Sequence, residues 1–300
     1  MSGCATTYHA GAPKGTIDVI AHRGASAYAP ENTLASFALA KELDADWFEL
    51  DCTLTQDGQI LVIHDDKVDR TTNGKGAVAD LTLAELKKLD AGSWQDPKFA
   101  GEPLPTLGEA LDLARQKRIG VYIEIKNCAE DGSLIEQIMR MAEGRDTLTP
   151  TMRREMMARI RASHTRNLEL TRKVITEVRK RRMTHQVVIQ SFSPIICAVA
   201  LDEAPKFRTE LLASKDEKKP ERWPMYLKWT GYLNPPGFNT NPESLDEALL
   251  KKMHAEGRTV AVWTVDEEPD MRRFVQWGVD AIITNRPDLC LKVLKEMGKH

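Results

Sequence analysis

Short apolar runs rich in β-forming residues alternate with amphipathic helical patterns along most of the chain. Such alternation predicts βα units around a parallel sheet. One run follows Asp57-Gly58, a hairpin-turn dipeptide, and is expected to pair with the preceding strand. Eight strands then remain, as in a TIM-type (β/α)8 barrel, and 300 residues can form that fold as one domain. The expected strands are Ile17–Ala21, Trp47–Thr53, Ile60–His64, Gly120–Lys126, Gln186–Ser191, Phe207–Leu212, Gly237–Thr240, Thr259–Val265 and Ala281–Thr284.

Helical periodicity fills most of the intervals between these strands. Asn32 is expected to cap the first helix, and Pro287 lies near the start of the last one, where proline is favoured. The expected helices are Asn32–Leu43, Leu83–Leu89, Leu107–Lys117, Ser133–Met141, Ser244–Ala255, Glu268–Trp277 and Asp288–Met297. The stretch Ala213–Pro224 is interpreted as a surface connection.

Two segments exceed a minimal barrel. A small insertion over 65–105 follows the second strand, and a longer, basic helical insertion is expected over 144–184. Between Met152 and Arg182 this second segment carries eleven Arg or Lys residues. Two interpretations are a solvated helical pair, which we favour, and a surface for anionic lipid. We expect one barrel domain over 16–300, preceded by a flexible segment over 1–15.

Composition indicates a globular protein and excludes several classes of partner. The formal charge of -2 gives no overall field for nucleic acid, and no apolar run is long enough for a membrane helix. Five cysteines without a C-x-x-C pair do not predict a disulfide framework or a zinc cluster. The start, Ser2-Gly3-Cys4, is similar to the end of a lipoprotein cleavage site. That reading predicts a periplasmic or lipid-anchored protein, and the alternative is a cytoplasmic one.

Carboxylates alternate with apolar residues on two of the expected strands. In 47–54 the apolar face must pack on helices, so Glu49 and Asp51 point into the barrel. The same alternation directs Glu124 and Lys126 inward from 120–126. Three converging carboxylates and no cysteine suit Mg²⁺ or Ca²⁺. The alternative is a buried ion-pair network around Lys126, which leaves two carboxylates uncompensated.

Two histidines follow strands at the rim where barrel enzymes carry their active sites. His22 follows Ile17–Ala21 and precedes Arg23, and His64 ends Ile60–His64. Imidazole transfers protons near neutral pH, and arginine, lysine and a metal ion can hold phosphoryl oxygens. The pattern indicates metal-assisted hydrolysis or transfer without identifying a substrate.

These residues lie within motifs that resemble those of the glycerophosphodiester phosphodiesterases, in order from about Ile17 to Asp288. The motifs are Ala21-His22-Arg23-Gly24-Ala25, Pro30-Glu31-Asn32-Thr33, Glu49-Leu50-Asp51, Thr53-Leu54-Thr55-Gln56-Asp57-Gly58, His64-Asp65, Glu124-Ile125-Lys126, Gln190-Ser191-Phe192, Val262-Trp263-Thr264-Val265 and Gly278-Val279-Asp280. One departure is Thr284-Asn285, where Thr-Asp is common in the family, and we expect it to be tolerated.

The resemblance implies a role for each residue of the expected site. The metal ligands would be Glu49, Asp51 and Glu124, which would hold one divalent cation, Mg²⁺ or Ca²⁺. The acid–base pair would be His22 and His64, phosphate would contact Arg23 and Lys126, and Trp263 would line the pocket beside glycerol. For Trp263, packing in the barrel core is equally possible. Glu31 would support the metal ligands or a histidine, and the insertion over 65–105 would cap the active-site mouth.

The implied reaction is hydrolysis of glycerophosphodiesters to sn-glycerol 3-phosphate and an alcohol. We assign His22 as base and His64 as acid, with the reverse still open. Alternatives are a lysophospholipase D or sphingomyelinase-D-like lipid phosphodiesterase, with peripheral membrane contact, and a non-catalytic phosphodiester-binding barrel. The head-group alcohol, the choice of metal ion and the oligomeric state stay open.

Overall fold

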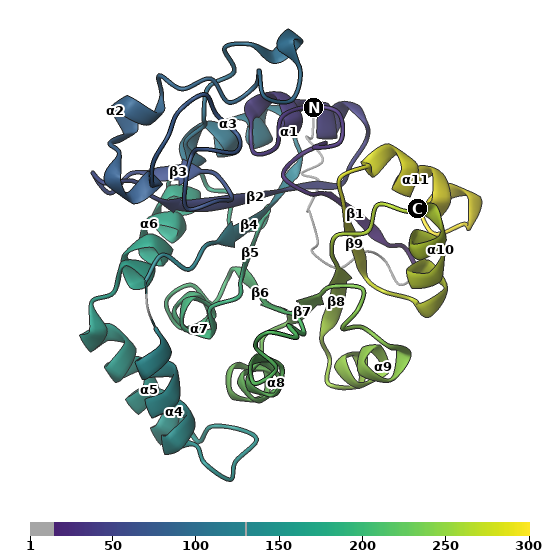
Figure 1. Cartoon of the computed structure of the whole chain (residues 1–300). Helices are drawn as coiled ribbons and strands as arrows, with labels where there is room; N and C mark the ends of the chain where they lie inside the picture. The colour runs from purple at the N-terminus through teal and green to yellow at the C-terminus, as the bar shows by residue number, and fades with distance from the viewer. Residues whose placement is uncertain (1–14, 130) are drawn as a thin grey trace, which may run out of the picture.

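The computed structural model describes residues 15–129 and 131–300, and within them the strands form one closed barrel (Figure 1). The sheet has nine strands in the order β1-β9-β8-β7-β6-β5-β4-β2-β3, and β1 also pairs with β2. Every pairing is parallel except β2 with β3, so eight parallel strands close a TIM-type barrel, as predicted. The strands are β1 Asp18–Ala21, β2 Trp47–Leu54, β3 Ile60–Val62, β4 Gly120–Ile125, β5 Val187–Ser191, β6 Arg208–Ala213, β7 Gly237–Thr240, β8 Thr259–Val262 and β9 Ala281–Thr284.

The expected strands all occur, with small differences at their ends. β3 forms an antiparallel hairpin with β2, as the Asp57-Gly58 turn predicts. β8 ends at Val262 instead of Val265, because its pairing with β9 stops at the register Val262 with Ile282. The chain leaves the sheet there and enters the loop at the carboxyl rim of the barrel.

The helices are α1 Leu34–Glu42, α2 Leu83–Leu86, α3 Leu107–Lys117, α4 Gly132–Met141, α5 Pro150–Ser163, α6 Arg166–Lys180, α7 Pro194–Glu203, α8 Arg222–Leu233, α9 Glu247–Ala255, α10 Glu268–Trp277 and α11 Pro287–Glu296, with short 3-10 turns η1 Val78–Asp80 and η2 Pro97–Phe99. Sequence periodicity did not predict α7 or α8. α7 is buried over 194–200 and therefore has no polar face to create a helical period. In α8, Pro224 and Gly231 weaken the pattern.

The expectation that Asn32 caps the first helix was wrong. Thr33 is the capping residue: its hydroxyl accepts a hydrogen bond from the Ser36 amide, and the Ser36 hydroxyl accepts one from the Thr33 amide, both at 3.3 Å. Asn32 has a positive φ of 57° and uses its side chain elsewhere, as described below.

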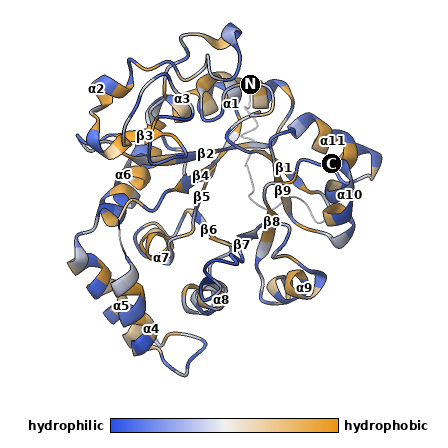
Figure 2. Ribbon diagram, in the orientation of Figure 1, coloured by the Kyte–Doolittle hydropathy of each residue, from blue (hydrophilic) through white to orange (hydrophobic). Residues whose placement is uncertain are grey.

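Apolar side chains of the strands point outward and pack against the helices. The helices carry both hydrophobic and hydrophilic residues (Figure 2). Phe48 and Leu50 pack in a cluster with residues of α1, α3 and α6. Val174 and Val178 of α6 belong to this cluster, so α6 is part of the helical layer around the barrel. The basic stretch 144–184 thus contributes α6 to that layer, while α5 packs beside α4, away from the barrel axis (Figure 1).

The segment 65–105 forms a separate small cluster around Val68, Leu86 and Leu104, beside the barrel. Of the cysteines, Cys4 lies outside the described residues, while Cys52, Cys128, Cys197 and Cys290 are unbonded. Among the described helices, none is both long and apolar enough to cross a membrane.

Candidate active site

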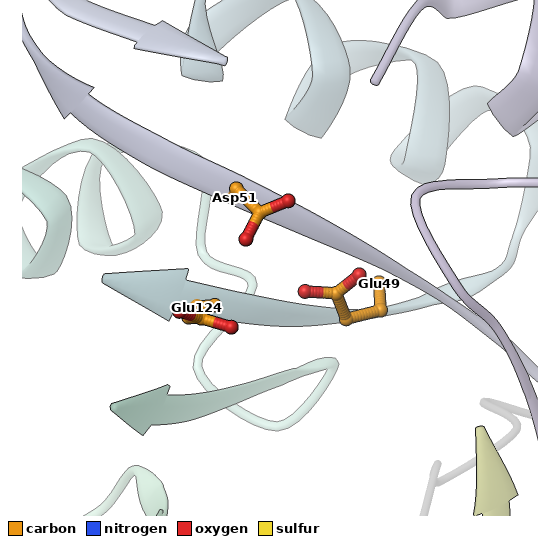
Figure 3. Close-up of side chains that lie close together, drawn as sticks. All are labelled: Glu49, Asp51 and Glu124. Atoms are coloured by element: carbon orange, nitrogen blue, oxygen red, sulfur yellow. The ribbon is translucent and has the colours of Figure 1, made fainter. Parts of the chain in front are cut away.

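Three carboxylates from β2 and β4 converge inside the barrel (Figure 3). Asp51 pairs with Glu124 in the parallel register, and Glu49 lies two residues earlier on the same face of β2. Their ligand atoms lie within 4.8 Å of one another, and the residues are 2%, 1% and 9% exposed for Glu49, Asp51 and Glu124. The sequence predicted all three positions from strand alternation.

The charges of this cluster are only partly balanced by protein groups. Burial, together with repulsion from Asp51 and Glu124, raises the pKa of Glu49 well above its ordinary value. Burial alone would also raise the pKa of Asp51, but Lys126 and Arg23 outweigh it and lower this pKa. Lys126 Nζ lies 3.5 Å from Asp51 and 2.9 Å from Glu124, whereas no side-chain nitrogen of a described Lys or Arg lies within 4.0 Å of the Glu49 carboxylate. An ion-pair network therefore accounts for Asp51 better than for Glu49, and the oxygen-only donor set fits a divalent cation.

The loop after β1 approaches these carboxylates through its backbone. Arg23 has a positive φ of 55°, and its amide donates a 2.9 Å hydrogen bond to Glu49. The next residue, Gly24, has a φ of 81°, and a Cβ atom there would lie 2.4 Å from Ser36 Oγ. Glycine is required at this turn, and such strained backbone often occurs at functional sites.

Asn32 holds Asp51 from the other end of this loop. Its Nδ2 donates to Asp51 Oδ2 at 2.9 Å, and its Oδ1 accepts from the Asp51 amide at 3.1 Å. The Arg23 guanidinium lies on the same carboxylate, with Nε 3.2 Å from Oδ2. Asp51 is thus held as an ionised, oriented group.

His22 makes its hydrogen bond to a neutral amide. Its Nδ1 lies 2.8 Å from Asn285 Oδ1, and Asn285 Nδ2 donates to Asp266 at 2.5 Å. A carboxylate can only accept hydrogen bonds, so the amide nitrogen of Asn285 must face Asp266. The amide oxygen of Asn285 then faces His22. Nδ1 of His22 must then carry the hydrogen, which leaves Nε2 to accept a proton. Burial, with the adjacent Arg23, lowers the pKa of His22 to about 4, so the ring is neutral at physiological pH.

His64 contacts a carboxylate instead. Its Nδ1 lies 2.6 Å from Asp65, which accepts a 2.7 Å hydrogen bond from Arg70 Nε. Arg70 also makes two 2.8 Å hydrogen bonds to Glu31, and Glu31 accepts one of 2.9 Å from Arg23. Mainly through its bond to Arg70, the pKa of Asp65 is lowered to about 2. A continuous chain of charged contacts therefore links His64, beside the 65–105 insertion, to the loop after β1.

Both histidines line one cavity of about 110 Å³. Its other lining residues include Arg23, Glu49, Glu124, Lys126, Phe192 and Trp263. Trp263 packs edge-on against Phe192, with ring centroids 5.4 Å apart, and its Nε1 is buried without a hydrogen-bond partner in the described structure. The structure thus brings together the residues that the sequence analysis singled out.

Three further residues of the site were not identified from the sequence. Asn32 was interpreted as a helix cap, Asn285 as a tolerated departure from the family pattern, and Arg70 was not considered. Glu31 contacts neither a histidine nor a carboxylate ligand directly, since its partners are Arg23 and Arg70. The positions of Asn32 within Pro30-Glu31-Asn32-Thr33 and of Asn285 after the last strand were the available signals.

Residues 22–289 match the model of the glycerophosphoryl diester phosphodiesterase family. The chain is 37% identical over 281 residues to a glycerophosphodiester phosphodiesterase of Caldanaerobacter subterraneus subsp. tengcongensis, with 93% of this chain and 98% of that protein covered. A glycerophosphodiester phosphodiesterase of Bacillus subtilis is 34% identical over 295 residues, covering 92% and 86%. An Oleispira antarctica phosphodiesterase, solved in complex with the product sn-glycerol-3-phosphate, superposes with a TM-score of 0.73 at 27% identity, covering 93% of this chain and 97% of that one.

Proposed function

We propose that this chain, which belongs to the glycerophosphoryl diester phosphodiesterase family, hydrolyses glycerophosphodiesters to sn-glycerol 3-phosphate and an alcohol with a divalent cation and two histidines. The observation that carries the proposal is one cavity lined by His22 and His64 beside a buried cluster of three carboxylates. The product held by the Oleispira antarctica phosphodiesterase supports the choice of substrate.

Glu49, Asp51 and Glu124 would hold the cation, which would be Mg²⁺ or Ca²⁺ because the three ligands offer only oxygen. When bound, the ion would neutralise phosphoryl oxygens and stabilise the negative charge of the transition state. The raised pKa of Glu49 supports this assignment, since an added positive charge would offset the burial and the carboxylate repulsion that raise it.

The protein's own groups would supply the remaining charge and the proton transfers. Arg23 and Lys126 line the cavity and would neutralise the diester. Nε2 of His22 would accept a proton from the nucleophile, either water or the glycerol 2-hydroxyl. Attack by the 2-hydroxyl would first give a cyclic glycerol phosphate, which water would then open to sn-glycerol 3-phosphate. As the bond from phosphorus to the leaving oxygen breaks, His64 would give its proton to that oxygen. Burial and the adjacent Arg23 keep His22 neutral, and Asn285 orients its ring. The Asp65 carboxylate orients the ring of His64.

The test is release of glycerol 3-phosphate from glycerophosphocholine, assayed with EDTA and after addition of Mg²⁺ or Ca²⁺. We expect release only with added cation, and the more effective ion identifies the working metal. Release that is unaffected by EDTA would contradict the metal-dependent mechanism. The absence of glycerol 3-phosphate with any cation and any glycerophosphodiester would refute the proposed activity.

A further inference from the structure

A groove of about 960 Å³ opens beside the catalytic cavity, between α4 and α8. The two spaces adjoin each other, because His64, Glu124, Lys126 and Phe192 line both of them. His22 and Trp263, in contrast, line only the small cavity. A substrate that fills the cavity on the His22 side can therefore extend past His64 into the groove.

The two facing helices contribute apolar, adaptable side chains to the walls of the groove. Ile135 and Met139 lie one turn apart on α4, and Met225 and Tyr226 belong to α8. Ile135, Met139 and Met225 are only partly buried, and each packs on the cluster beneath α4, α5 and α7. Flexible methionines on facing helices suit apolar ligands of varied shape.

The rim of the groove has an excess of negative charge. Carboxylates on it include Asp66, Glu136, Asp216 and Glu221. Arg140 pairs with Glu136 at 3.0 Å, and Arg222 also lines the groove, which leaves more carboxylates than basic groups. Such a rim disfavours an anionic group and tolerates a neutral or cationic one. The groove is therefore suited to a long ligand that is apolar and carries no negative charge.

We propose that this groove is the subsite for the leaving alcohol, and that it selects alcohols with an extended apolar chain and no negative charge. The proposal rests on the proposed function, in which His64 protonates the leaving oxygen. Since His64 lies where the cavity joins the groove, an alcohol protonated there has its carbon chain in the groove. The glycerol phosphate half then remains on the side of His22.

A series of synthetic diesters tests this assignment. Each has glycerol 3-phosphate esterified to ethanol, butanol, hexanol or octanol, and is assayed below its micelle concentration. We expect kcat/KM to rise with chain length, by about two- to four-fold for each methylene that is removed from water. A rate that is flat or falls from ethanol to octanol would overturn the subsite. Because every member releases glycerol 3-phosphate, failure of the proposed function itself would appear as no release from any diester.

A pair of variants connects this selectivity to the groove. Met139→Glu places a charge on the groove wall, and we expect the octanol-to-ethanol ratio of kcat/KM to fall about tenfold. Met141→Glu is the matched control, because Met141 is also a partly buried methionine of α4 but lies outside the groove. The control should keep the wild-type ratio. Equal loss of the ratio in both variants, with circular dichroism of folded protein, would also contradict the proposal.

The charge preference has its own test. A diester of ω-hydroxyoctanoate has the octanol chain ended by a carboxylate, and we expect its kcat/KM to be at least about tenfold below that of the octanol diester. In Glu221→Lys, which reverses one rim charge, this difference should shrink. An unchanged preference in that variant would argue against an electrostatic role of the rim.

Discussion

Nδ1 of His22 lies 2.8 Å from the amide oxygen of Asn285, 263 residues away in the chain. The second histidine of the cavity, His64, makes the equivalent contact to a carboxylate, that of Asp65, at 2.6 Å. A neutral acceptor stabilises an imidazolium less than a carboxylate does. This difference between the two partners supports the proposed roles of His22 as base and His64 as acid.

The first prediction concerns Asn285→Asp. The new carboxylate should raise the pKa of His22, which burial lowers to about 4 in the wild type. A base works only above its pKa, so the acid limb of kcat/KM should move to higher pH, with roughly tenfold loss at about pH 5 and less at higher pH. The measurement is the pH profile at saturating metal, with the His22 ring titrated by NMR. An unchanged acid limb would show that His22 is not the titrating base.

The loss of activity in the two histidine variants should depend differently on the leaving group of the substrate. His22→Ala and His64→Ala should each lower turnover of glycerophosphocholine by roughly 10²-fold or more. With a p-nitrophenyl diester the leaving group needs no proton, so His64→Ala should recover most of its activity, whereas His22→Ala should not. Recovery by His22→Ala alone would reverse the two roles.

Metal binding should be visible without catalysis. We expect Mg²⁺ or Ca²⁺ at about 100 times its Kd to stabilise the wild type by about 2.7 kcal/mol in thermal unfolding. Glu124→Gln should lose this shift, because it removes one of the three ligands. Glu49→Gln should also lose it, and without metal it should be more stable than the wild type, since burial and the neighbouring Asp51 and Glu124 disfavour the ionised form of Glu49. A full metal-induced shift in both variants would place the cation elsewhere.

Arg70 should matter for turnover more than for stability. Its side chain is 45% exposed, so its ion pairs contribute little to the stability of the fold. It nevertheless bridges Asp65 and Glu31 through bidentate hydrogen bonds. Arg70→Lys cannot reproduce these contacts and should lower kcat roughly tenfold with little change in Tm. Lys75→Ala serves as the control, because Lys75 pairs with Asp69 in the same insertion and is 81% exposed. If Arg70→Lys kept the wild-type kcat, Arg70 would have no role in positioning His64 through Asp65.

Much of the site could be predicted because it depends on local rules. Side chains alternate across a strand, so Glu49, Asp51 and Glu124 were directed inward by the apolar residues between them. The two histidines were recognised because they follow strands. The hairpin of β2 and β3 likewise follows from its turn residues.

Tertiary structure decided the contacts that no local pattern encodes. Asn285 meets His22 only because β9 closes the barrel against β1, and Arg70 reaches Glu31 only because the 65–105 insertion folds over the loop after β1. The groove exists because α4 and α8, which about 80 residues separate in the chain, face each other across the mouth. The sequence by itself determined the alternation of elements and the face on which each strand carries its charges. Chain closure and helix packing, which are long-range, determined what each of those charges touches.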